Sequence, residues 1–210
     1  MEKLMEDLER GFGAQVELTS SWHVEEGGME AEYESIMASA CTLDLADIIA
    51  AQHFMNYSLW HVEDTARRLD VPAETIADCK RKIDVFNQKR NDLMEKADET
   101  IMNAISPFLP PNAAEKYNTE TLGMAIDRMS IMALKIFHMR EQAERADAGQ
   151  EHIAKCRRKL SQLMEQRVWL KRAIFDLVDD FFAGRKSIRP YFQHKMYNDE
   201  TLNPELYGKS

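Results

Sequence analysis

The chain has 210 residues and carries 27 Lys and Arg against 36 Asp and Glu, a formal net charge of −9. Hydrophobic residues make up 44%, while Gly and Pro number only 8 and 6, a balance typical of a globular helical protein rather than a disordered one. The acidic balance argues against nonspecific binding to nucleic acid or to an anionic membrane, since both need a cationic face. No apolar run approaches the roughly 20 residues that span a bilayer, and residues 1–10 lack a signal-peptide core, so we expect a cytoplasmic protein.

The first 41 residues are expected to form an N-terminal helical extension. Their helical pattern is weak, and we expect glycines to break it, at Gly11, Gly13 and Gly27-Gly28. The remaining residues, 42–210, are expected to form one helical domain.

The first predicted hairpin begins with Thr42 as a helix N-cap, followed by an apolar rhythm over about residues 43–69. Asp70-Val71-Pro72 interrupts this rhythm. Because proline suits a first helical turn, a second helix is expected from there to about residue 103. The turn is short, so the two helices should be antiparallel neighbours.

The second predicted hairpin follows a proline-containing linker. Thr119 is the expected cap of a third helix over about residues 120–147, and a fourth helix runs over about residues 150–183 and ends near Gly184. Residues 186–210 contain several large apolar side chains, and we expect them to form a C-terminal strap over the bundle.

The two hairpins are related in sequence. Shifting residues 54–93 by 77 positions lays them without a gap on residues 131–170, with identity at 13 of the 40 pairs. The identical pairs include His61 with His138, Cys79 with Cys156 and Arg90 with Arg167. An internal repeat indicates one supersecondary unit used twice. We therefore predict an all-α helical bundle in which duplicated antiparallel hairpins, about residues 43–103 and 120–183, pair about a pseudo-twofold axis.

Hairpin geometry predicts a polar layer across this bundle. Positions on two antiparallel helices lie at one level when their residue numbers have a constant sum, since each residue rises ~1.5 Å along its axis. Together with the pseudo-twofold axis, this rule places the following residues in one layer: His53, Asn56, Asn87, Arg90, Asn91, Asp127, Ser130 and Arg167. Arg90 follows Ile76 and Ile83 at seven-residue spacing, so we expect it to point inward.

Two interpretations of the layer stay open. In one, Arg90 and Arg167 are neutralised by carboxylates such as Asp127 or Asp84, and the network sets helix register. In the other, the two guanidiniums and the neighbouring amides bind an anionic small molecule, because their donors suit phosphate or carboxylate. Asp84 belongs to the candidate set because the first hairpin is more polar than the second at equivalent positions.

A second candidate site consists of two histidine–acid pairs, His61 with Asp64 and His138 with Glu141. Each pair is spaced i, i+3 and so shares one helix face. Brought together by pseudo-symmetry, the pairs offer two nitrogens and two carboxylates, enough for a metal ion in a bundle core. The residues expected at their level are cationic, which opposes metal binding and favours a plain surface pair: Arg81-Lys82 and Arg158-Lys159.

A third candidate site contains four carboxylates, Asp44, Asp47, Glu95 and Asp98. Both pairs are spaced i, i+3 and fall at one level, an arrangement that can hold a divalent metal such as Mg²⁺ through oxygen ligands. Helix-borne carboxylates of this kind serve all-α nucleoside triphosphate pyrophosphohydrolases. Acidic residues near a bundle end are more often simply solvated.

Four long motifs occur in order along the chain. They are N-x-x-L-W-H-x-E-D-x-A-R from Asn56 to Arg67, K-R-x-I-D-x-x-N-Q-x-R-N-D from Lys80 to Asp92, E-T-x-G-x-x-I-D-R-x-S-I-x-x-L-K-I-x-H from Glu120 to His138, and K-M-Y-N-D-x-x-L-N-P-x-L-Y from Lys195 to Tyr207. Together they resemble the bacterial family DUF4254, a domain of unknown function, over about residues 45–207. The resemblance implies no particular reaction. Genes of the family lie near glycosyltransferase and cell-envelope glycan genes, which implies a link to glycan metabolism.

Three functions are therefore considered. The first is binding of an anionic, phosphorylated small molecule in the polar layer. The second is a helical adaptor without catalysis, which should show an exposed apolar stripe for a protein partner or a second copy of the chain. The third is a Mg²⁺-dependent pyrophosphohydrolase-like enzyme. The chain has no nucleophile elbow, phosphate loop or dinucleotide fingerprint, so whether it is an enzyme stays open.

Overall fold

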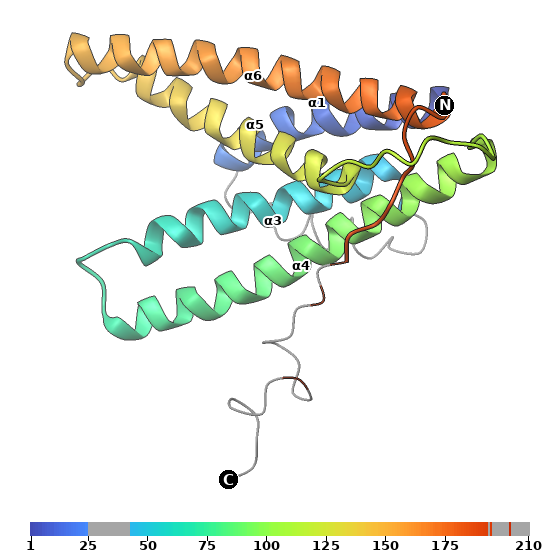
Figure 1. Cartoon of the computed structure of the whole chain (residues 1–210). Helices are drawn as coiled ribbons and strands as arrows, with labels where there is room; N and C mark the ends of the chain where they lie inside the picture. The colour runs from blue at the N-terminus through green and yellow to red at the C-terminus, as the bar shows by residue number, and fades with distance from the viewer. Residues whose placement is uncertain (25–42, 193, 195–201, 203–210) are drawn as a thin grey trace.

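The computed structural model describes residues 1–24, 43–192, 194 and 202, and most of them are helical (Figure 1). In chain order the elements are α1 (Glu2–Val24), α3 (Leu45–Ala66), α4 (Ala73–Ile105), the 3-10 turn η1 (Ser106–Phe108), α5 (Leu122–Glu144) and α6 (Gln150–Phe182). These residues contain no strand, which confirms the all-α class. In the same part of the chain, no helix combines the length and the apolar character that crossing a membrane requires.

The four predicted bundle helices are present, with ends close to those expected. α3 packs on α4 and α5 packs on α6, each pair antiparallel and joined by a short turn (Figure 1). α5 also contacts α1, α3 and α4, so it is the helix through which the two pairs meet. That the two hairpins superpose about a pseudo-twofold axis stays a prediction.

α1 runs through Gly11 and Gly13 without a break, so the prediction that these two glycines end helices was wrong. The cause is tertiary packing, because a Cβ on Gly11 would lie 2.7 Å from Cδ1 of Ile49. Gly11 thus allows α1 to lie close against α3. One face of α1, from Leu4 to Trp22, is buried in the main core cluster. The predicted break at Gly27-Gly28 lies outside the described residues.

Two helices begin two residues later than the caps expected from the sequence. The N-cap of α3 is Asp44, whose side chain accepts a hydrogen bond from the backbone N–H of Asp47 at 3.0 Å. The N-cap of α5 is Thr121, whose Oγ1 accepts from the N–H of Met124 at 3.1 Å. Thr119 was therefore wrong as a cap, and so was Thr42, which lies outside the described residues. In both helices the observed cap is the residue whose side-chain oxygen reaches the unpaired N–H groups of the first turn.

The chain after α6 lies against the linker between α4 and α5. The N–H of Ser187 donates to the carbonyl oxygen of Lys116 at 2.9 Å, and the Tyr191 hydroxyl donates to the carbonyl oxygen of Asn118 at 2.6 Å. The start of the predicted strap therefore covers the linker. Apart from residues 194 and 202, the strap beyond residue 192 lies outside the described residues.

Candidate functional site

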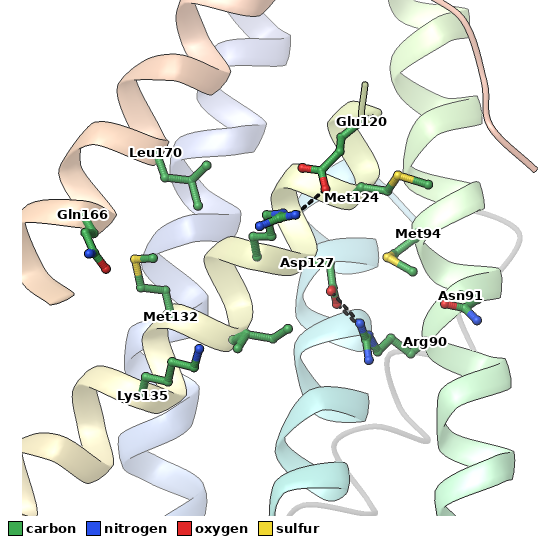
Figure 2. A pocket seen from close by; sticks show the side chains of 12 residues that line it. Arg90, Asn91, Met94, Glu120, Met124, Asp127, Met132, Lys135, Gln166 and Leu170 are labelled. Carbon is green, nitrogen blue, oxygen red and sulfur yellow. Dashed lines mark hydrogen bonds and ion pairs between the residues drawn. The ribbon is translucent and has the colours of Figure 1, made fainter. Parts of the chain in front are cut away.

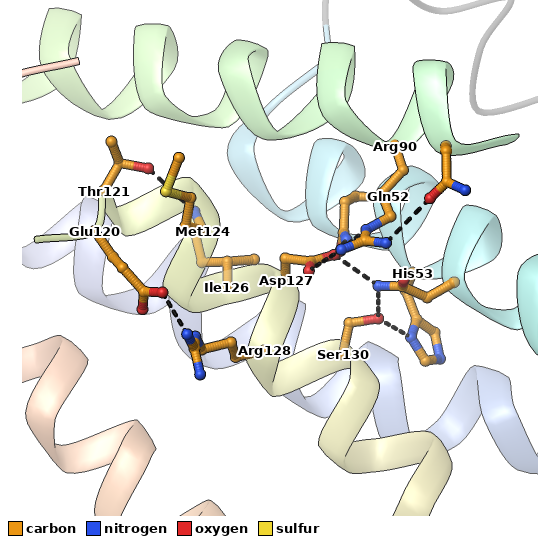
Figure 3. A network of polar contacts seen from close by, with 12 residues as sticks. Gln52, His53, Arg90, Glu120, Thr121, Met124, Ile126, Asp127, Arg128 and Ser130 are labelled. Carbon is orange, nitrogen blue, oxygen red and sulfur yellow. Dashed lines mark hydrogen bonds and ion pairs between the residues drawn. The ribbon is translucent and has the colours of Figure 1, made fainter. Parts of the chain in front are cut away.

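Asp127 of α5 is the centre of a polar layer between α3, α4 and α5 (Figure 3). Its side chain is buried, and its Oδ1 accepts hydrogen bonds from Nδ2 of Asn56 at 2.9 Å, from Nε2 of Gln52 and from Nε of Arg90 at 2.9 Å. Oδ2 accepts from Nη2 of Arg90 at 2.8 Å. Four N–H donors point at its two oxygens, so Asp127 acts as an acceptor that orients its neighbours.

Arg90 of α4 is only partly used by this network. A guanidinium has five N–H donors. Two of these donors of Arg90 form hydrogen bonds to Asp127, and a third, on Nη1, donates to Oδ1 of Asn87 at 3.3 Å. One N–H on each of Nη1 and Nη2 makes no hydrogen bond to the described residues. Asp127 thus fixes the orientation of Arg90 and leaves two donors for another partner.

The Arg90–Asp127 pair lies in the wall of a cleft of about 670 Å³ between α4, α5 and α6 (Figure 2). The charged lining residues are Arg90, Arg128, Lys135, Asp127 and Glu120. Three cations and two anions give this lining a small positive excess, in a chain whose net charge is −9. The rest of the wall consists of Asn91, Met94, Met124, Ile131, Met132, Gln166 and Leu170. The cleft therefore combines a cationic side with an apolar, methionine-rich side.

A directional chain of hydrogen bonds runs from the layer towards α1. Nδ2 of Asn56 donates to Oγ of Ser130 at 2.9 Å, and that hydroxyl lies 2.8 Å from Nδ1 of His53. Nε2 of His53 lies 2.9 Å from Oγ1 of Thr19, whose hydroxyl donates to the carbonyl oxygen of Gln15 at 2.7 Å. Because the Thr19 hydroxyl donates its only hydrogen to the carbonyl oxygen of Gln15, it can only accept a hydrogen bond from His53. Nε2 of His53 therefore carries the ring proton. Nδ1 of His53 then accepts from the Ser130 hydroxyl.

His53 is therefore held as a neutral imidazole. Burial, reinforced by the charge of Arg167, lowers the pKa of His53 from its ordinary value of 6.5 to about 3. A second proton on the ring would also displace the hydrogen bond from Ser130, because Nδ1 would become a donor. Both ring nitrogens of His53 are occupied by these hydrogen bonds, which gives the residue a structural role.

The predicted layer is thus assembled in part. Asn91 lines the cleft, but Asp84 pairs with Lys80 on the surface of α4 and is outside the layer. Arg167 lines a different cavity, between α1, α5 and α6, and its Nη2 donates to the carbonyl oxygen of Phe12 at 2.8 Å. Burial lowers the pKa of Arg167. The two guanidiniums therefore do not converge on one ligand, and Arg90 is the arginine of the cleft.

Three of the four carboxylates proposed for Mg²⁺ have structural roles in the fold. Asp44 and Asp47 form a capping box at the start of α3, where Asp44 also pairs with Arg10. Oδ1 of Asp98 accepts a hydrogen bond from the N–H of Gly123 at 2.7 Å, and burial raises the pKa of Asp98. In the part of the chain that is described, Glu95 does not join them in any group of three metal-binding side chains. Among the described residues, these four side chains do not form a common group of metal-binding atoms, and their binding of Mg²⁺ stays a prediction.

His61 and His138 do come together, with ring centroids 5.9 Å apart. Nδ1 of His138 is 2.9 Å from Oε2 of Glu141, whereas Asp64 is exposed. A third histidine, His23 of α1, completes the group, and one ring nitrogen of each histidine lies within 4.8 Å of the other two. Sequence reasoning missed His23 because it lies outside both the internal repeat and the four motifs. Thr19 was missed for the same reason, whereas residue counting places Gln52 beside Asn91 but Gln52 was not included in the predicted layer.

One comparison with known proteins identifies a family. The family model described as "Protein of unknown function (DUF4254)" matches residues 46–189, more than half of the 210-residue chain. This chain belongs to the DUF4254 family. No curated protein and no solved structure matches it. The segment matched by the DUF4254 model contains Arg90, Asp127, His61 and His138, but not His23.

Proposed function

We propose that this DUF4254 protein binds an anionic small molecule, such as a phosphorylated sugar or a nucleotide, in the cleft beside Arg90. The observation that carries the proposal is the pair of N–H groups that Arg90 keeps after Asp127 has fixed its orientation. Arginine presents its donors in a rigid fork that matches phosphate and carboxylate oxygens. Because Asp127 already holds the guanidinium, a ligand does not have to order this side chain, which lowers the entropic cost of binding.

The remainder of the cleft supports the same ligand class. Lys135 is exposed on α5 at the cleft wall, and Arg128 pairs with Glu120 at its edge. The volume of about 670 Å³ lies in the ordinary range for small-molecule sites. The methionine-rich wall offers apolar contact to the uncharged part of a ligand. The link to glycan metabolism implied by the family motifs stays a prediction.

Thermal unfolding of the full chain with anions tests the proposal. Suitable probes are inorganic pyrophosphate, uridine diphosphate and glucose 1-phosphate, each compared with sodium chloride at the same ionic strength. A ligand at 100 times its Kd stabilises the folded state by about 2.7 kcal/mol, which raises the melting temperature. Arg90→Lys should remove this rise, because lysine cannot reproduce the fork. Arg145→Lys is the matched control, since Arg145 holds Asp147 through the same two-bond geometry on an exposed turn outside the cleft.

Two results contradict the proposal. One is that no anion in the panel raises the melting temperature above the chloride control. The other is that Arg90→Lys responds to the effective anion as strongly as the parent chain. Circular dichroism of each variant without ligand separates loss of binding from loss of fold.

A second candidate function, protein interaction, rests on exposed apolar side chains of α6. Met164, Val168 and Trp169 are 49%, 65% and 59% exposed, and the first two are spaced i, i+4 on one face. If this face binds a second copy of the chain, the parent should sediment as a dimer and Val168→Glu as a monomer. Val85→Glu, at an exposed valine of α4, is the control. A monomeric parent would count against self-association.

A further inference from the structure

A group of three histidines lies where the C-terminal end of α1 meets α3 and α5. His23 belongs to the last turn of α1, His61 to α3 and His138 to α5. One nitrogen from each ring lies within 4.8 Å of the other two. The anion site does not use these residues. We propose that His23, His61 and His138 bind one divalent transition-metal ion of the Zn²⁺ type, for which imidazole nitrogen is a preferred ligand.

The hydrogen bonds of two of the rings set their tautomers. Nδ1 of His23 lies 2.6 Å from the carbonyl oxygen of Thr19, and a carbonyl can only accept, so this nitrogen carries the proton. Nδ1 of His138 donates in the same way to Oε2 of Glu141. In the neutral rings, Nε2 of both residues therefore has a lone pair. Each Nε2 is buried and makes no hydrogen bond to the described residues. Such an atom is costly to bury unless it has a partner, and a metal ion is one.

The spacing of the rings agrees with a shared ion. The centroids of His23 and His61 are 5.1 Å apart, those of His23 and His138 are 4.9 Å apart, and those of His61 and His138 are 5.9 Å apart. For two imidazoles bound tetrahedrally with metal–nitrogen bonds of about 2.1 Å, ring centroids are about 5 Å apart. On binding, the three ring nitrogens, which lie within 4.8 Å of one another, would move to about 3.4 Å, the separation that such bonds require.

Aromatic side chains surround the three rings and restrict their rotation. Trp60 stacks on His138 with centroids 4.6 Å apart, and Phe137 stacks on His23 at 4.1 Å. Tyr57 lies against His61 at 4.4 Å. Apolar shells of this kind exclude water and strengthen the bond to the metal, while the carbonyl and carboxylate partners of the Nδ1 atoms orient the ligands.

The ligand set differs from the one expected from sequence, in which the acids themselves bind the metal. Glu141 contacts His138 and so acts through it, while Asp64 is exposed. The cationic residues expected to oppose the metal are all exposed, so solvent screens them: Arg81, Lys82, Arg158 and Lys159. Three protein ligands leave the fourth tetrahedral position for water or another molecule, the pattern of zinc sites that take part in chemistry.

Metal content and the spectrum of a Co²⁺ derivative test the site. The full chain is stripped with a chelator, dialysed against Zn²⁺ or Co²⁺ and analysed for bound metal. We expect one ion per chain and the intense visible absorption of four-coordinate Co²⁺. His23→Ala and His138→Ala should lose both. His152→Ala, which removes an exposed histidine of α6, should keep both. Melting curves in chelator show whether each variant is folded.

Glu141→Gln tests the site without removing a ligand. Its side chain is 52% exposed, so the fold should be unaffected, but its loss should weaken metal affinity about 10–100-fold because the carboxylate orients His138. Glu144→Gln, at an exposed glutamate of the same helix, should bind as the parent does. Failure of the stripped parent to take up one equivalent of Zn²⁺ would overturn the proposal. So would unchanged binding by the folded His23→Ala variant, which would assign the metal to other residues.

Discussion

The neutral, fully buried His53 makes the stability of the fold sensitive to acid. Its folded-state pKa of about 3 lies below the ordinary value of 6.5 that applies in the unfolded chain. Between these two values the unfolded chain binds the extra proton and the folded chain does not. The contribution of His53 to stability is therefore complete above pH 6.5 and is lost as the pH falls towards 3.

The size of this effect follows from the two pKa values. Below pH 6.5, each decrease of one pH unit lowers the free energy of unfolding by about 1.4 kcal/mol until the folded-state pKa is reached. At pH 4.5 the free energy of unfolding should thus be about 3 kcal/mol lower than at pH 7 on account of this one residue. A domain of this size is typically stable by about 5–15 kcal/mol, so the loss is readily measured.

Urea denaturation at several pH values between 7 and 4.5, in a chelating buffer, compares the parent with His53→Gln. Glutamine keeps a donor and an acceptor but does not titrate in this range. The variant should be less stable at pH 7, because the chain of hydrogen bonds is disturbed, but it should lose about 3 kcal/mol less than the parent on acidification. His152→Gln controls for the loss of one histidine. Equal acid sensitivity of the parent and His53→Gln would refute the assignment of a neutral His53.

Helix packing and capping yield further predictions. Gly123→Ala would place a Cβ 2.4 Å from the carbonyl oxygen of Met94, so α5 must move away from α4. We expect the free energy of unfolding, measured in urea, to fall by about 2 kcal/mol or more. Gly13→Ala meets nothing within 4 Å and should instead stabilise α1 by about 0.5–1 kcal/mol; the same sign for both glycine variants would contradict this reasoning. Asp44→Ala removes the N-cap of α3 and should lower the free energy of unfolding by about 1 kcal/mol. An unchanged urea midpoint would contradict this prediction.

The sequence by itself determined the elements and part of the site, because both depend on short-range patterns. Apolar periodicity and short turns predicted α3 to α6, since residues close in the chain decide whether a helix forms and where it ends. The seven-residue spacing of Arg90 after Ile83 predicted the face on which its side chain lies. Counting residues along the antiparallel helices then predicted that Asn56 and Asp127 lie in the same layer as Arg90. In the structure, both Asn56 and Arg90 donate hydrogen bonds to Asp127.

Tertiary structure decided which of these side chains are partners. Arg90 and Arg167 are equivalent in the sequence repeat, yet one pairs with Asp127 and the other with the backbone of α1 at Phe12. α1 has no counterpart in the repeat, so its position between the hairpins makes the two arginine environments different. The same helix brings His23 to His61 and His138. A contact between segments so far apart in the chain depends on how closely the helices pack, as at Gly11, and no local pattern encodes that distance.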